Sequence, residues 1–359
     1  MQWLSAGVHK LFIMHNGDAQ LRKVTVRAVP ELIFCKFQYN PHVTEYGPYD
    51  WRFLKRYVLP HVNTIIGGGS SKHKPFIEEW KRCGGKWLIE TPNVWARSGK
   101  VPTADGIFRI WTANVGMREP MLDGIIVDEF GGGNRPEYPA WTEAVARIAA
   151  DERFRNKMYY AYCGGGMHTA DMSRKFVETL FKHGYRVALE RYLSERPDEN
   201  SARDFLRTAL TDEMLAWKRT FANCERNMVM CFGHLSAPPE SLNIDPSVDY
   251  KVFMDMQFNV IANDPAFFGL FGVMEYTCGY ADEEFVRWAA MLYRHYCIEG
   301  NTDMLSKRYG FRYKLNHIEN PDFAEGLNGW RIIPAQDGSI ATKLVRGLSW
   351  LEGRYPRTS

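Results

Sequence analysis

Two adjacent carboxylates follow an apolar run near the middle of the chain. In Asp123-Gly-Ile-Ile-Val-Asp-Glu-Phe130, residues 125–127 are β-branched and apolar, and Asp128 and Glu129 come directly after them. Such a run is typical of a strand that is covered on both faces. Glycines 131–133 then open a flexible segment. Two carboxyl groups at the end of a rigid strand can exchange protons or act as nucleophiles, so this segment is the first candidate for catalysis. The alternative is that one acid caps a helix or pairs with an arginine.

Three more acids, Glu90, Glu190 and Glu275, stand at the ends of other short apolar runs. Because a buried and unpaired carboxylate is costly to desolvate, the repeated placement predicts a shared polar pocket. Each acid also has a structural alternative. Glu90 can bind loop amides, and Glu190 can pair with the neighbouring Arg191. Glu275 can support the site from behind.

Further polar side chains follow the expected strands. Parallel barrels hold their chemistry at the carboxyl ends of their strands, so we expect these side chains to contact a substrate. His168 and His234 are loop histidines, and a lone histidine is more often structural than catalytic. The expected substrate-binding residues are Asp128, Lys36, Gln38, Glu90, Asn93, Tyr162, His168, Arg191, His234 and Tyr276.

A regular alternation of short apolar runs and amphipathic stretches begins at Glu31. Eight strand–helix units in about 270 residues is the period of a (β/α)8 barrel, and this count disfavours an open, doubly wound sheet. The expected strands are 32–37, 64–66, 87–89, 125–127, 158–162, 186–189, 228–232 and 270–274. The expected helical stretches are 49–62, 76–83, 103–119, 138–150, 171–183, 200–223, 248–262 and 282–299. Glycine triplets after three of the strands match no phosphate-loop pattern, so we interpret them as flexible or closely approached backbone.

The two ends of the chain differ from this barrel region. Residues 1–30 predict two strands around the Asn16-Gly17 turn, either a hairpin or the remnant of an N-terminal β domain. The segment from Asn320 to Trp330 looks like the opening of a jelly-roll, carbohydrate-binding-type module, and too little chain follows to complete one. We therefore expect an α/β barrel at 31–300, a β-rich extension at 301–359, and a chain that is one piece of a longer protein.

The composition bounds the partners and the compartment. The net charge of +3 comes from mixed signs without a basic block, which argues against nucleic acid as a partner. No apolar run approaches the ~18 residues of a membrane span. The amino terminus lacks the features of a signal peptide, so the location stays open, and a periplasmic or secreted parent protein is compatible. Seven cysteines without a Cys-x-x-Cys pair argue against a metal knuckle or a dense disulfide framework.

The chain resembles the (β/α)8 glycoside hydrolases. The resemblance rests on the barrel rhythm, on the strand that ends in Asp128 and Glu129, and on the module-like segment from Asn320. The strand motif is similar to the Asp-Gly-x-Asp-x-Asp-x-Glu of chitinase-like barrels. It departs from that motif because Ile126 replaces the middle acid and the glutamate directly follows the aspartate. The Asn-Glu pair of another large clan is absent, so the resemblance reaches the superfamily and no single family.

The resemblance implies cleavage of a glycosidic bond in an oligo- or polysaccharide, with neither metal nor cofactor. Such enzymes flank the bond with two carboxyl groups, about 5–5.5 Å apart in retaining enzymes and about 6.5–9.5 Å apart in inverting ones. We expect Glu129 to fill one role and Glu190 or Glu275 the other. Asp128 would hold Glu129 or a sugar hydroxyl.

Two other functions fit the same residues. One is a metal-dependent barrel of the sugar isomerase or epimerase type, since carboxylates and histidines suit Mg²⁺, Mn²⁺ or Zn²⁺, although no local ligand spacing supports it. The other is a non-catalytic barrel that binds glycans through aromatic side chains and has lost one carboxylate. Metal dependence separates the first from a hydrolase. A variant that loses turnover and keeps binding separates the hydrolase from the second.

Overall fold

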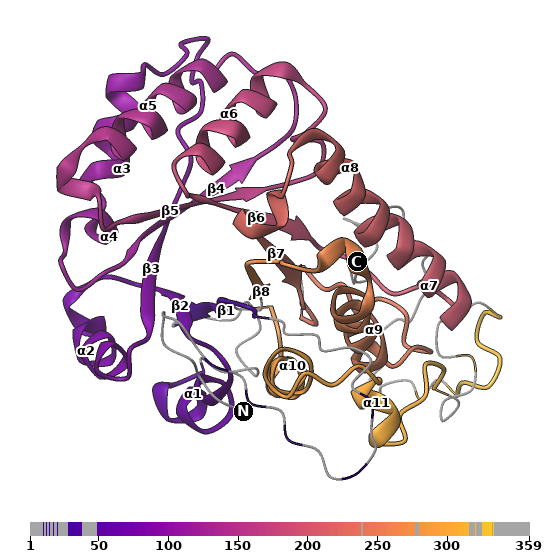
Figure 1. Ribbon diagram of the computed structural model, residues 1–359. Coiled ribbons are helices and arrows are strands. Elements are labelled where there is room, and N and C mark those ends of the chain that lie inside the picture. The colour runs from indigo at the N-terminus through magenta and orange to yellow at the C-terminus, as the bar shows by residue number, and fades with distance from the viewer. Residues whose placement is uncertain are drawn as a thin grey trace.

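Eight parallel strands close into a barrel in the order β1 to β8 (Figure 1). The computed structural model describes residues 28–37, 49–237, 240–276 and 280–315, and in addition positions 10, 12, 14, 17, 20, 320, 325–331 and 333. The first strand pairs with the second on one side and with the eighth on the other, so the sheet has no open edge. The predicted (β/α)8 fold is therefore confirmed.

The strands are short and almost fully buried, as their β-branched and aromatic residues predict. Seven of them begin within one residue of the expected positions, whereas the eighth starts and ends two residues later than expected. Their bounds are β1 (Glu31–Phe37), β2 (Thr64–Gly67), β3 (Lys86–Thr91), β4 (Gly124–Phe130), β5 (Met158–Cys163), β6 (Arg186–Arg191), β7 (Met228–Gly233) and β8 (Gly272–Tyr276).

Helices surround the barrel, and in Figure 1 they form an outer ring around the strands. The α-helices are α1 (Trp51–Tyr57), α2 (Lys74–Arg82), α3 (Ala104–Ala113), α4 (Val115–Arg118), α5 (Tyr138–Ala150), α6 (Asp171–Lys182), α7 (Glu199–Leu206), α8 (Glu213–Thr220), α9 (Tyr250–Asn263), α10 (Glu283–Leu292) and α11 (Leu305–Arg308). Two π-helical segments are η5 (Arg207–Asp212) and η8 (Tyr293–Ile298). Short 3₁₀ turns are η2 (Leu59–His61), η3 (Ser71–His73), η4 (Glu152–Phe154), η6 (Cys224–Asn227) and η7 (Pro265–Phe267).

Aspartate side chains fix where four of these helices begin. Asp50, Asp198, Asp249 and Asp282 each accept a hydrogen bond from a backbone N–H in the first turn of α1, α7, α9 and α10. Such caps satisfy amide groups that have no partner inside the helix, and each stabilises it by about 0.5–2 kcal/mol. The helix starts are therefore set locally by the sequence.

The apolar residues form two cores because side chains alternate across each strand. The larger core fills the space between strands and helices. The smaller core fills the barrel interior and includes Ile33, Ile126, Tyr160, Ala188 and Cys231. This interior set identifies which residues of each strand face the lumen, and so which polar residues above it face the same way.

Residues 301–315, which the sequence assigns to the C-terminal extension, pack on the barrel. They include α11, and the Ser306 N–H donates to the buried Asp255 at 2.6 Å. In the module-like segment, the Asn320 side chain donates to the carbonyls of Gly326 and Asn328, and the Trp330 indole donates to the Asn320 carbonyl. Most of 1–30 and of 316–359 lies outside the described residues, so the predicted β structure at the two ends stays a prediction.

Every helix within the described ranges is too short or too polar to cross a lipid bilayer.

Candidate active site

Three carboxylates stand above the interior core at the carboxyl ends of their strands. Glu90, Asp128 and Glu190 lie two residues beyond lumen-facing apolar residues of β3, β4 and β6, so the strand alternation directs them into the barrel mouth. Cys231 lies beneath them in the interior core. Burial raises the pKa of the Cys231 thiol, and the charges of all three carboxylates raise it further. The three acids from different strands therefore lie close enough together at the barrel mouth for their charges to act on one thiol.

Lys36 supplies the positive charge in this pocket. Its Nζ lies 2.6 Å from Glu90 Oε1, and both side chains are largely buried. The β1–β2 register shifts between Cys35 and Phe37, and the Cys35–Lys36 peptide is cis. A close, partly desolvated ion pair is stronger than an exposed one, so Lys36 and Glu90 form a fixed part of the wall.

The carboxyl group of Asp128 holds its proton more tightly than an exposed aspartate. Burial raises the pKa of Asp128 to about 6, and the negative charges of Glu90 and Glu129 contribute to the rise. The Lys36 ammonium acts in the opposite direction. Near neutral pH, Asp128 therefore changes easily between its acid and its carboxylate form.

The pKa of Glu190 is raised further than that of Asp128. Burial raises the pKa of Glu190 to about 7, and the Tyr192 hydroxyl, which donates to Oε1 at 3.0 Å, limits the rise. The charges of Asp128, Glu129 and Glu90 add to it. A glutamate that is protonated at neutral pH is what a general acid requires.

Glu129 leaves the regular strand. Its φ of 63° is in the left-handed region, and the β4–β5 register shifts between Val127 and Phe130. A bulge of this kind redirects side chains, and a left-handed φ is uncommon for a residue with a Cβ atom. The Glu129 side chain is exposed, and the Asn93 amide lies 3.5 Å from its carbonyl oxygen. Glu129 therefore stands at the rim, close enough for its charge to act on Asp128 and Glu190.

Glu275 and His234 lie behind the pocket. Met274 and Tyr276 flank Glu275 and belong to the interior core or pack against it, so Glu275 points to the opposite side of β8, towards the helices. Its Oε1 lies 3.5 Å from Nδ1 of His234, and both side chains are almost fully buried. Burial raises the pKa of Glu275, and the nearby His234 opposes the rise. The structure therefore does not bring Glu275 into the mouth with the other acids.

His168 and Arg191 belong to a separate cluster at the edge of the site. Arg191 Nη2 lies 2.7 Å from Glu213 Oε1, and His168 Nδ1 lies 3.8 Å from the same oxygen. The Trp217 indole donates to this carboxylate as well, at 3.1 Å. Since Arg191 follows the lumen-facing Glu190, it points outwards to α8. The cluster joins the loop after β5 to α8 and does not face Asp128.

Tyrosine side chains line the mouth beside Glu190. The Tyr162 hydroxyl lies 3.2 Å from Cys35 Sγ, and the rings of Tyr162 and Tyr276 pack edge to face. The Tyr276 and Tyr192 rings lie 5.7 Å apart. Gln38, the remaining predicted site residue, lies outside the described residues.

Sequence reasoning missed Tyr192 and the glycine that supports it. A Cβ atom on Gly233 would lie 2.6 Å from Tyr192 Cδ1, so the ring rests on the bare backbone of β7. Tyr192 stands two residues after Glu190, and the period of a strand would have placed both on one face. That spacing is the signal that could have identified it. No such signal marks Gly233.

The described residues contain no group of three His, Cys, Asp or Glu side chains with the geometry of a metal site. The acids at the mouth lie close enough for their charges to interact.

Comparisons with known proteins find similar solved structures at low sequence identity. No protein-family model and no curated protein sequence matches the chain. A solved structure of active domain 2 of a thermostable chitinase from Pyrococcus furiosus matches with 10% identity and a TM-score of 0.49, over 80% of this chain and 99% of that chain. The spore cortex-lytic enzyme SleL of Bacillus cereus matches with 10% identity and a TM-score of 0.45, over 78% of each chain. A family 18 chitinase from Crocus vernus matches with 12% identity and a TM-score of 0.45, over 72% of this chain and 98% of that one.

The chain has a closed (β/α)8 barrel. At these identities the similarity concerns the fold, and one fold serves many reactions. The function therefore has to be argued from the side chains at the mouth.

Proposed function

We propose that the protein is a glycoside hydrolase in which Glu190 donates the proton and Asp128 is the second carboxyl group. The observation that carries the proposal is the placement of these two acids. Both face the lumen at the carboxyl ends of β6 and β4, and burial raises their pKa values to about 7 and about 6. Two neighbouring carboxyl groups that differ in proton affinity are the requirement for this reaction.

The chemistry follows from the order of the two pKa values. Glu190 keeps its proton up to about pH 7 and can deliver it to the oxygen of the leaving group. Asp128 is ionised above about pH 6 and can attack the anomeric carbon or activate a water molecule. Since each charge disfavours the other, the pair titrates as a unit. Hydrolysis should therefore be fastest between about pH 6 and 7.

The neighbouring groups suit a sugar substrate. Tyr192 is 38% exposed, and with Tyr276 it offers an apolar surface to the face of a sugar ring. The Lys36–Glu90 pair presents a cation and an acceptor to ring hydroxyls. These contacts would orient a glycan across the mouth.

Glu129, which the sequence favours, is the competing partner for Glu190. Its carboxyl group is exposed at the rim, next to Asp128 in the chain. The lumen-facing direction and the burial of Asp128 favour Asp128, because a desolvated group held on a regular strand is better oriented for reaction. Variants of the two residues decide between them.

The test is turnover of a panel of fluorogenic glycosides and labelled oligosaccharides by single variants. Asp128→Asn and Glu190→Gln should each lower kcat/KM by at least about 10²–10⁴-fold, since amides cannot transfer a proton or attack as carboxylates. Glu129→Gln is the matched control and should keep most of the activity. Glycan binding, measured by calorimetry, should survive in all three variants.

Other outcomes assign the site differently. A large loss in Glu129→Gln together with an active Asp128→Asn would transfer the role to Glu129. Turnover that chelator removes and Mn²⁺ or Zn²⁺ restores would favour the metal-dependent isomerase or epimerase. Glycan binding without turnover by the unmodified protein would favour the non-catalytic barrel.

A further inference from the structure

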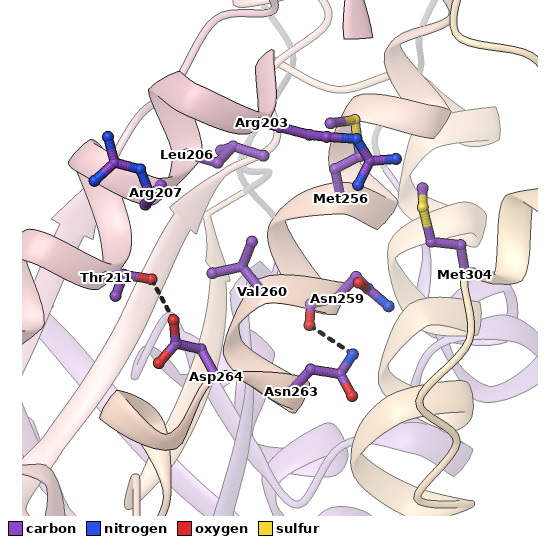
Figure 2. Close-up of a pocket in the computed structure, with 10 residues that line it drawn as sticks. All are labelled: Arg203, Leu206, Arg207, Thr211, Met256, Asn259, Val260, Asn263, Asp264 and Met304. Carbon is purple, nitrogen blue, oxygen red and sulfur yellow. Dashed lines mark hydrogen bonds between the residues drawn. The ribbon is translucent and has the colours of Figure 1, made fainter. Parts of the chain in front are cut away.

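Two hollows lie on the flank of the barrel, away from the mouth. The first, of about 360 Å³, is bounded by α7, η5 and α9 (Figure 2). The second, of about 400 Å³, lies between the start of α7, α9 and the segment from α11 to Lys314. Met304 lines both, so the two hollows are adjacent, and together they are called the groove. None of the acids at the mouth lines it.

The charge of this groove is opposite to that of the mouth. Five cationic side chains and two carboxylates line the two hollows. In the second hollow, the side chains of Lys307 and Arg312 have no hydrogen bond or ion pair with any residue of the described ranges. Their charges are therefore available to a ligand.

The cations of the first hollow are only weakly engaged. Arg203 and Arg207 stand one helical turn apart, and Figure 2 shows them along the upper edge of the cavity. Their ion-pair partners, Glu199 and Asp212, are themselves well exposed. Exposed pairs contribute about 0–1 kcal/mol, so a bound anion can replace either partner at little cost.

The single acid of the first hollow is occupied by the protein itself. Asp264 Oδ2 accepts from the Thr211 hydroxyl at 2.8 Å, and Oδ1 accepts from the Ala266 N–H at 2.9 Å. In Figure 2 this contact lies at the lower edge, opposite the two arginines. The positive charge of the first hollow therefore lies along the edge formed by Arg203 and Arg207.

The floor of the groove is apolar and mostly aliphatic. Leu206, Met256 and Met304 are buried and separate the charged rims. The aromatic side chains of the second hollow are engaged elsewhere. Tyr313 is buried with its hydroxyl bonded to the backbone of Arg196, and Phe311 stacks on other rings.

We propose that this groove binds an anionic polysaccharide, such as a chain of uronic acids, as a site separate from the mouth. Carboxylates of the glycan would pair with the basic rims, and the apolar faces of its rings would cover the aliphatic floor. A single-stranded nucleic acid is the main alternative for a basic groove. It depends on exposed aromatic rings on which bases stack, and the aromatic rings of the groove are already packed against the protein.

The test is binding of a short oligogalacturonate to the full-length protein, measured by calorimetry. The double variant Lys307→Gln/Arg312→Gln should raise Kd about tenfold or more, because a hydrogen bond to a charged group contributes about 1.5–3 kcal/mol and 1.4 kcal/mol is a factor of ten. Arg82→Gln/Lys182→Gln removes two exposed charges on other helices and should change Kd less than about twofold. Raising NaCl from about 20 to about 150 mM should weaken binding by the unmodified protein.

Three further arms can overturn the proposal. The fully methyl-esterified oligomer should not bind, since it keeps the backbone and loses the charges. Glu190→Gln should bind as the unmodified protein does, which makes the result independent of hydrolysis. Absence of oligogalacturonate binding, equal losses in the two double variants, or tighter binding of an oligothymidylate that Lys307→Gln/Arg312→Gln weakens would each refute an anionic glycan site.

Discussion

The hydrogen bond from Tyr192 sets how readily Glu190 loses its proton. The Tyr192 hydroxyl donates to the carboxylate and so lowers a pKa that burial has raised to about 7. In Tyr192→Phe this donor is lost, and the pKa of Glu190 should rise by about one unit. If Glu190 is the proton donor, the alkaline limb of the plot of kcat/KM against pH should move to higher pH by the same amount. Tyr309→Phe, at an exposed and distant tyrosine, should leave the profile unchanged.

A different response would assign Tyr192 another role. An unchanged pH profile with a raised KM would show that the ring only contacts substrate. A shift of the alkaline limb to lower pH would show that this hydrogen bond does not lower the pKa of Glu190.

For single residues, the sequence could not predict the direction in which each side chain points. Acids at the ends of β3, β4 and β6 are visible in the sequence, and in the structure the charges of all three act on Cys231. Which of Asp128 and Glu129 enters the lumen depends on a bulge and a left-handed residue, and neither leaves a pattern in the residue types. Adjacent residues of a strand face opposite sides of the sheet, so an error of one residue exchanges the two sides. The sequence predicts Glu275 at the mouth, whereas in the structure it points to the helices.

Among the secondary-structure elements, strand β4 requires a glycine as its first residue. Gly124 has a φ of +145°, and a Cβ atom there would lie 1.9 Å from the carbonyl oxygen of Met158 on β5. Gly124→Ala should therefore lower the free energy of unfolding by at least about 2 kcal/mol, through backbone strain and overpacking. Urea unfolding measures it. Gly164→Ala is the matched control, because its nearest neighbour would lie 3.7 Å away and its φ is not positive. Equal stability of the two variants would contradict the close approach of β4 and β5.

Most elements could be predicted because local signals agree with the fold. Apolar runs of three to six residues predicted the strands, and aspartates at the helix starts are caps in the structure. The eighth strand was placed two residues early because Leu270 and Phe271 extend its apolar run. The π-helical segments η5 and η8 could not be predicted, since their sequences are ordinary helical ones.

For the whole molecule, closure of the barrel separates two regions of opposite charge. The carboxylates at the mouth come from the ends of strands, whereas the basic groove belongs to helices on the flank. A net charge of +3 describes neither region. Composition alone therefore argued against nucleic acid as a partner, whereas the arrangement in space concentrates positive charge on one flank of the barrel.

The end of the folded unit can be located by truncation. Asp255 is fully buried and accepts hydrogen bonds from the Tyr296 hydroxyl and the Ser306 N–H. Tyr313 exchanges hydrogen bonds with the backbone of Arg196, and Leu315 donates to Ser247. Residues 301–315, which the sequence assigned to an extension, thus pack on the barrel through buried hydrogen bonds.

We therefore expect two truncated chains to differ. A chain ending at residue 315 should keep its Tm within about 2 °C of the full-length protein, because the contacts of α11 and Tyr313 remain. A chain ending at residue 300 removes the backbone donor of the buried Asp255 and also the contacts of α11 and Tyr313 with the barrel. Its Tm should fall by at least about 5 °C, or the chain should fail to fold. Calorimetry of the two chains measures the difference, and an unchanged Tm after removal of 301–359 would place the boundary at residue 300, as the sequence alone suggests.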